Sequence, residues 1–156
     1  MTNKLSTPIT ILVLAVLTTA FCGTAVAGNE ESTGPSLYER LGSMDGIGNI
    51  VRDTIALHHA NPDVSHYFEG VDDEKLAKHV VAFFAAGTGG PANYEGRDMT
   101  SLHAPMKLSS DDFDSVVVDV LEAVEANGID AASKAEVAAI LESLRPAVMG
   151  TAQPSS

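Results

Sequence analysis

Several residue types that carry chemistry in other proteins are rare or missing here. The chain of 156 residues has one cysteine, Cys22, no tryptophan, and only 5% aromatic residues. It has no HExxH, CxxC or paired-carboxylate motif, so nothing supports a zinc hydrolase. The glycine-rich run GTGGP (87–91) follows a predicted helix instead of preceding one, which argues against a phosphate-binding loop.

Positive charge is also scarce. The chain has nine lysine and arginine residues and 21 aspartate and glutamate residues, which gives a net charge of −12. An acidic surface repels phosphate backbones and anionic lipid headgroups, so we expect neither a nucleic acid nor a membrane surface as partner.

The first 27 residues (1–27) have the pattern of a secretory signal peptide. MTNK is a short basic start, ITILVLAVLTTAF is an apolar run too short for a comfortable membrane span, and AVA places small residues before Gly28. Cleavage there predicts a mature protein without cysteine or disulfides, periplasmic or secreted, and free of the membrane. Two alternatives stay open: a lipoprotein anchor at Cys22, which the preceding Phe21 fits poorly, and an uncleaved membrane anchor.

The rest of the chain predicts a single all-α domain at 36–148, between a leader at 28–35 and a tail at 149–156. Helices are predicted at 36–42, from Asp45 to the sequence ANPD, from DDEK to GTGGP, and at 99–103, 109–128 and 133–148. In the third of these helices, apolar residues at helical spacing form an inward stripe: Leu76, Val80, Phe83, Phe84 and Gly87.

The five histidines are the remaining candidates for chemistry: His58, His59, His66, His79 and His103. We interpret His59 and His66 as surface residues. Taken singly, His79 and His103 fit boundary or packed histidines near helix ends. Taken together, they lie on two helices separated by GTGGP and a loop, which could place them on opposite sides of a flat ligand. Imidazole is the usual axial ligand of haem iron, and the apolar stripe with Phe68 and Met99 would line an apolar slot.

The order of these segments resembles the truncated haemoglobins, the two-over-two globins, and most closely their group 1. The segments that carry the resemblance are SLYERLG, NPDVSHYFEGVD and HVVAFFAAGTGGPANYEGRDMTSLH, and the likeness covers residues 36–148. It implies a two-over-two helical sandwich around haem b, with a diatomic gas (oxygen, nitric oxide or carbon monoxide) as ligand.

The resemblance also assigns roles to individual residues. His103 would be the proximal iron ligand, Phe68 would stack against the porphyrin, and Met99 would pack on the proximal side. The residues implied to line the distal side are Leu76, Val80, Phe83 and Phe84. Tyr94 and Arg97 lie where the haem edge could be reached.

The distal positions depart from the family pattern. Ile55, preceded by Thr54, stands where many relatives have a tyrosine, and Val80 replaces a common glutamine. Losing such donors removes charge-assisted hydrogen bonds to bound oxygen of about 1.5–3 kcal/mol, so tight oxygen storage is not expected. His58 lies three residues past Ile55 and has two interpretations, a further distal polar group or a partly buried helix-end histidine.

His79 has three interpretations by this resemblance: a sixth iron ligand, a partner of the haem propionates, or a distal hydrogen-bond donor.

The function predicted first from these residues and the resemblance is an exported haem globin that binds a diatomic gas. The alternative is a six-coordinate protein with His79 and His103 as iron ligands, active in electron transfer or in nitric oxide, nitrite or peroxide chemistry with an unidentified reductant. A third hypothesis is a binding module that has lost haem.

Overall fold

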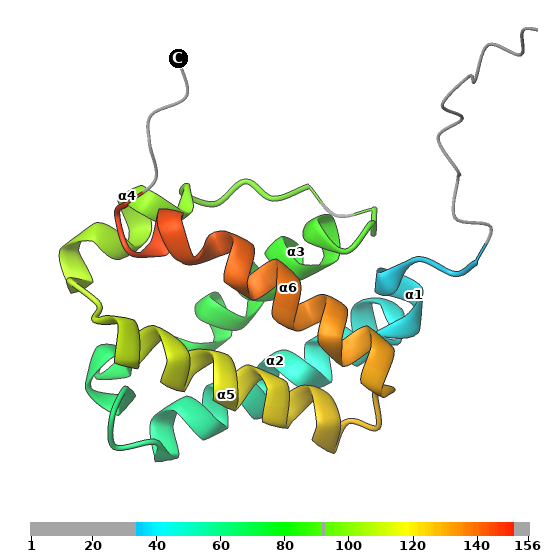
Figure 1. Cartoon of the computed structure of the whole chain (residues 1–156), viewed down its shortest axis with the longest axis horizontal. Coiled ribbons are helices and arrows are strands. Elements are labelled where there is room, and N and C mark those ends of the chain that lie inside the picture. The colour runs from blue at the N-terminus through cyan, green and yellow to red at the C-terminus, as the bar shows by residue number, and fades with distance from the viewer. Residues whose placement is uncertain (1–33, 92, 152–156) are drawn as a thin grey trace, which may run out of the picture. The chain divides into compact units, whose positions relative to one another are not determined.

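A computed structural model describes residues 34–91 and 93–151 of the chain. The predicted signal peptide, Cys22, most of the leader and most of the tail lie outside these residues. The elements are α1 (Leu37–Arg40), α2 (Ser43–Ala60), the 3₁₀ helix η1 (Ser65–Phe68), α3 (Asp73–Gly87), α4 (Met99–His103), the 3₁₀ helix η2 (Ala104–Met106), α5 (Ser110–Ala126) and α6 (Ala131–Val148) (Figure 1). The all-α prediction is confirmed. Within the described ranges, no helix is both long and apolar enough to cross a lipid bilayer.

Side-chain caps set the helix starts. Ser36 and Glu39 form a reciprocal capping box at α1, as the sequence predicts. Ser109 forms a second capping box at α5. Helix α6 begins at Ala131 instead of Ser133 because the carboxylate of Asp130 accepts hydrogen bonds from the backbone N–H groups that follow it.

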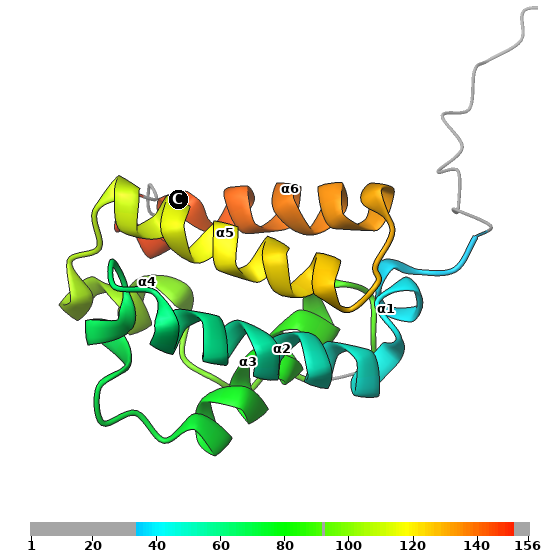
Figure 2. The same cartoon turned by 90° about the horizontal axis from the view of Figure 1, so that it is seen from below.

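The helices form two layers, with the pair α5 and α6 lying against the pair α2 and α3 (Figure 2). Helix α2 contacts both α3 and α5, and α4 packs against α6. The core lies between the layers and consists of branched aliphatic side chains and alanines, among them Ile47, Ile50, Val51, Ala85, Val120, Ala123, Val124 and Val137. Their burial provides the main stabilisation of a fold with no disulfide in its described part.

The double glycine Gly89-Gly90 lets the chain turn sharply after α3. Gly89 has a φ of +90°, which other residues rarely adopt. A side chain at Gly90 would lie 2.5 Å from the ring of Tyr38, so only glycine fits there. The chain therefore leaves α3 abruptly and passes α1 on its way to α4.

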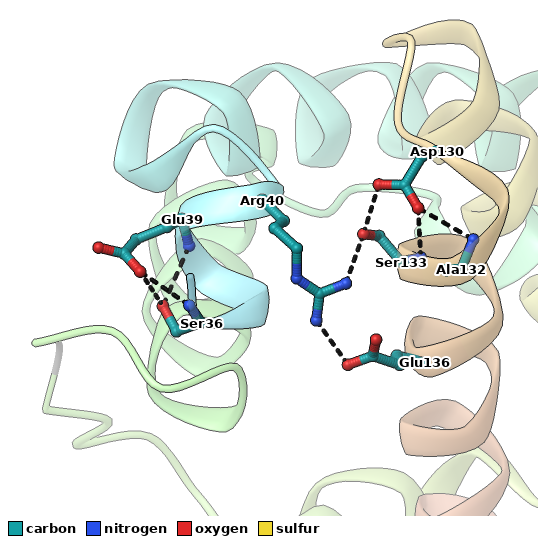
Figure 3. A network of polar contacts seen from close by, with 7 residues as sticks. All are labelled: Ser36, Glu39, Arg40, Asp130, Ala132, Ser133 and Glu136. Atoms are coloured by element: carbon teal, nitrogen blue, oxygen red, sulfur yellow. Dashed lines mark hydrogen bonds and ion pairs between the residues drawn. The ribbon is translucent and has the colours of Figure 1, made fainter. Parts of the chain in front are cut away.

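A polar network fastens α1 to the start of α6 (Figure 3). The Arg40 guanidinium donates to Ser133 Oγ at 2.7 Å and to Glu136 Oε2 at 2.7 Å. Ser133 is fully buried, and its hydroxyl donates in turn to Asp130 Oδ2 at 2.7 Å. This network lies at the N-terminal end of α2, and the candidate site extends toward the other end.

Candidate functional site

The helices enclose a cavity of about 440 Å³ with mainly apolar walls. Every element except α1 contributes to it. The lining includes Ile50, Val51, Thr54 and His58 of α2, Phe68 of η1, Leu76, Val80, Phe83 and Phe84 of α3, Met99, Leu102 and His103 of α4, and several aliphatic residues of α5 and α6. A cavity of this size and polarity is typical of a site for a flat apolar cofactor with a few polar anchors.

His103 is one of those polar anchors. It is the last residue of α4, a short helix whose start is fixed by the Asp98 carboxylate accepting from the Ser101 N–H at 2.8 Å. The Nδ1 atom of His103 lies 2.8 Å from the carbonyl oxygen of Met99. Since a carbonyl only accepts hydrogen bonds, Nδ1 carries the proton and Nε2 keeps its lone pair. This is the tautomer in which a histidine binds a metal through Nε2, with its other nitrogen held by an acceptor.

Much of the apolar lining comes from one side of α3. Leu76, Val80, Phe83 and Phe84 all line the cavity, and so do Phe68 and Met99. The structure thus brings these predicted cofactor contacts together around one space. The spacing of the stripe explains this, because residues at i, i+4, i+7 and i+8 share one face of a helix.

Three predicted site residues lie elsewhere. Ile55 is buried but lines a groove between α2 and α3, and its neighbour Thr54 faces the cavity instead. Tyr94 lies outside the cavity lining, and its ring makes a T-shaped contact with Phe83, with centroids 5.2 Å apart. His79 is exposed and also outside the lining. For Ile55 and His79 the reason is the step of about 100° per helical residue, which a short sequence pattern does not locate to within one position. Tyr94 lies in the loop between α3 and α4, where no helical spacing fixes the direction of its side chain.

His58 lies on the cavity wall and belongs to a buried polar cluster. Its Nδ1 lies 2.8 Å from Asp119 Oδ2, and its ring stacks on Phe68 with centroids 4.9 Å apart. The two oxygens of Asp119 also accept from Asn61 Nδ2, each at 3.0 Å, and Asn61 donates to Ser115 Oγ at 2.9 Å. Burial lowers the pKa of His58 from its ordinary value, and the neighbouring Asp119 carboxylate opposes that shift.

Sequence reasoning did not single out Asp119. A signal was present, because Asp119 lies directly before Val120 and four residues before Ala123, on the buried face of α5. A carboxylate at such a position needs a partner, since an unpaired buried charge is costly. The partner could not be identified from sequence, because His58 lies 61 residues away. His59 and His66 are exposed, as expected.

The donor set fits haem. In the part of the chain that the structure describes, no group of three or more His, Cys, Asp or Glu side chains could hold a bare metal ion. His103 therefore offers a single imidazole on an apolar wall. Such a ligand would suit an iron whose remaining ligands come from a porphyrin.

Comparisons with known proteins agree with this geometry. The family model described as "Bacterial-like globin" matches residues 36–150. The chain is 27% identical over 115 residues to the group 1 truncated hemoglobin of Tetrahymena pyriformis, covering 74% of this chain and 95% of that protein. It is 26% identical to the group 1 truncated hemoglobin GlbN of Mycolicibacterium paratuberculosis, covering 72% of this chain and 83% of that protein.

Solved structures show the same likeness. The Fe(III) form of the Tetrahymena pyriformis truncated hemoglobin superposes with a TM-score of 0.71 at 26% identity, over 74% of this chain and 98% of that chain. Chlamydomonas reinhardtii THB1 has a TM-score of 0.64 at 30% identity, over 75% of this chain and 100% of that chain. The fold of this chain is thus similar to those of known truncated hemoglobins.

Proposed function

We propose that this chain, which belongs to the bacterial-like globin family and has the truncated, two-over-two haemoglobin fold, is an exported haem protein that binds a diatomic gas at an iron held by His103. Membership of the family implies haem b as the cofactor. The observation that carries the proposal is the hydrogen bond from His103 Nδ1 to the Met99 carbonyl, on the wall of an apolar cavity. It leaves Nε2 as the only ring nitrogen available to iron.

The residues around the cavity have separate roles in the proposed function. Haem iron, when bound, supplies an open coordination position for a small gas. His103 holds the cofactor from one wall, and the α4 backbone orients its ring. Leu76, Val80 and Phe84 exclude water from the other wall. Because Val80 offers no hydrogen-bond donor and the short side chain of Thr54, not Ile55, faces the cavity, we expect oxygen to bind weakly relative to carbon monoxide, which needs little polar support.

His103 would be the one side chain of this protein that binds the iron at rest. The six-coordinate alternative, with its redox chemistry, needs the imidazole of His79 inside the cavity, whereas this side chain is exposed and outside the lining. The position of His79 agrees better with the interpretation as a propionate partner. The visible absorption spectrum of the ferrous protein distinguishes ligation by His103 alone from ligation by His103 and His79, because sharp split bands without added ligand indicate six-coordination.

Axial ligation by His103 is tested with a cavity variant. His103→Gly should bind haem without the wild-type axial spectrum, and added imidazole should restore that spectrum. His79→Gly is the matched control and should retain the wild-type spectrum throughout. If His103→Gly binds haem with unchanged axial ligation, the central part of the proposal is wrong.

Export is the remaining part of the proposal and rests on residues 1–27. Intact-mass measurement of the protein from the soluble export compartment should give a chain that begins at Gly28. A chain that retains Met1, or one that is lipidated at Cys22, would contradict it.

A further inference from the structure

We propose that His58 and Asp119 form a general-base pair on the cavity wall, which takes the proton of a small weak acid so that the ligand binds as its anion. The inference rests on the proposed function, since ferric haem is what receives the anion. The ligand class is a protic molecule H–X small enough for the cavity, such as hydrogen sulfide, hydrogen cyanide or hydrazoic acid. This is a different class from the diatomic gases, which carry no proton.

The first step of the argument is the tautomer of His58. Asp119 Oδ2 lies 2.8 Å from His58 Nδ1, and a carboxylate can only accept a hydrogen bond. The carboxylate is itself held in place, because Asn61 donates to both of its oxygens. The proton of neutral His58 is therefore on Nδ1, and Nε2 carries the lone pair.

The second step is the direction in which Nε2 opens. His58 lines the cavity that also contains His103. Among the described residues, His58 Nε2 has no hydrogen-bond partner, while no fully enclosed side-chain nitrogen or oxygen lacks one. Nε2 is therefore accessible, and because His58 is buried and lines the cavity, we infer that Nε2 opens into the cavity. The ring cannot easily turn away, because it is stacked on Phe68 and anchored at Nδ1.

The third step concerns charge. The titratable groups that act on His58 are Asp119 on α5 and the adjacent His59 on α2. Tyr67 of η1, which donates to Asp112, lines the same cavity, as do Arg97 and His103. Burial lowers the pKa of His58, so the ring is neutral near pH 7 while the cavity holds no anion. The negative charge of a bound anion would raise that pKa, so that the ring keeps the proton it accepts. Uptake of a proton converts a buried carboxylate beside a neutral ring into a charge-balanced ion pair, which compensates for part of the burial cost.

The proton-transfer step is balanced without any redox partner. The H–X bond breaks, its electron pair stays on X, and the proton moves to His58 Nε2. Asp119 remains a carboxylate and stabilises the imidazolium through Nδ1–H. Aprotic ligands gain nothing from this pair, because the neutral Nε2 offers a lone pair and no hydrogen.

The number of protons released on cyanide binding tests the pair in the haem-loaded ferric protein. Hydrogen cyanide is undissociated near neutral pH, so binding as the anion releases a proton unless a protein group retains it. Calorimetry in buffers of different ionisation enthalpy measures that release. We expect almost no release from the wild type and about one proton per cyanide from His58→Gln, which keeps a donor toward Asp119 but cannot take up a proton.

His59→Gln is the matched control. It changes the adjacent histidine, which has its own carboxylate partner, Asp73, at 3.0 Å on the exposed side of α2. This variant should release as little proton as the wild type. If His58→Gln fails to fold, Asp119→Asn keeps an acceptor for His58 Nδ1 while removing the negative charge, and should also release more proton than the wild type.

Nitrogen-15 spectra of the histidine rings give a readout that does not depend on ligand affinity. His58 should show a protonated Nδ1 and a bare Nε2 before cyanide is added, and two protonated nitrogens afterwards. Equal proton release from wild type and His58→Gln, or a ring that stays neutral after cyanide binding, would overturn the pair. A chain that takes up no haem at all would overturn the proposed function itself, which the absorption spectrum shows separately.

Discussion

Two histidines on the inner and outer faces of α2 have partners of the same kind in opposite surroundings. His58 and His59 are adjacent, and each has an aspartate partner, at 2.8 Å for Asp119 and 3.0 Å for Asp73. The side chains of the inner pair are 7% and 9% exposed, and those of the outer pair 41% and 51%. Solvent screens the outer pair, whereas the inner pair has no water to replace a lost partner.

The aromatic environment does not account for the difference. Phe68 contacts both rings, stacking on His58 at 4.9 Å and meeting His59 edge-on at 6.0 Å. What separates the pairs is one step along the helix, which turns one imidazole into the cavity and the next toward solvent. The same two residue types thus form a candidate proton-transfer site on one face and an ordinary surface ion pair on the other.

The largest effect should come from removing the inner carboxylate. Asp119→Ala leaves both His58 Nδ1 and Asn61 Nδ2 without their acceptor in a buried position, and should lower the free energy of unfolding by about 3 kcal/mol. Denaturant unfolding measures this, with Asp73→Ala as the matched control. Equal losses in the two variants would show that burial does not distinguish the pairs.

Replacing both members of the inner pair should recover much of that loss. The double variant His58→Leu with Asp119→Leu leaves fewer unsatisfied polar groups beside an apolar cavity, so its stability should return to within about 1.5 kcal/mol of the wild type. The same denaturation experiment supplies the value. A double variant no more stable than Asp119→Ala would mean that the pair is needed for packing and not only for polar satisfaction.

The inner pair should also make stability depend on pH. The pKa of folded His58 is lowered from the ordinary value of 6.5, so below that pH the unfolded chain binds more protons than the folded one. Stability should fall as the pH drops below about 6.5, until the lower pKa of the folded state is passed. Unfolding curves of wild type and His58→Leu over this range measure the effect. His58→Leu should lose this part of the slope and His59→Leu should keep it; the reverse result would assign the slope to the outer histidine.

The smallest effect is expected on the outer face. Asp73→Ala removes an exposed partner that water replaces, so stability should change by about 0.5 kcal/mol or less, and the change should shrink further in high salt. Denaturant unfolding at low and high ionic strength is the measurement. A loss of stability as large as that of Asp119→Ala would show that the exposed pair contributes as much as the buried pair.

Much of the site could be predicted where the relevant signal is local. The stripe of Leu76, Val80 and Phe83 follows from helical spacing, and it lines the cavity. The start of α1 follows from Ser36 and Glu39, whose groups meet within one helical turn. The sequence pattern also placed Ile55 and His79 at the cavity, but in the structure neither side chain lines it. Their directions depend on how α2 and α3 are rotated against their neighbours.

By itself the sequence determined an acidic, all-α chain with helices that start at their capping residues, and an imidazole, His103, one turn after Met99. These features depend on interactions between residues a few positions apart, which the order of residues already contains. Only the tertiary structure decided that Thr54 and not Ile55 faces the cavity, and that Asp119 meets His58. The packing of α2 against α5 brings that pair together, and a contact across 61 residues depends on how whole helices bury their apolar faces.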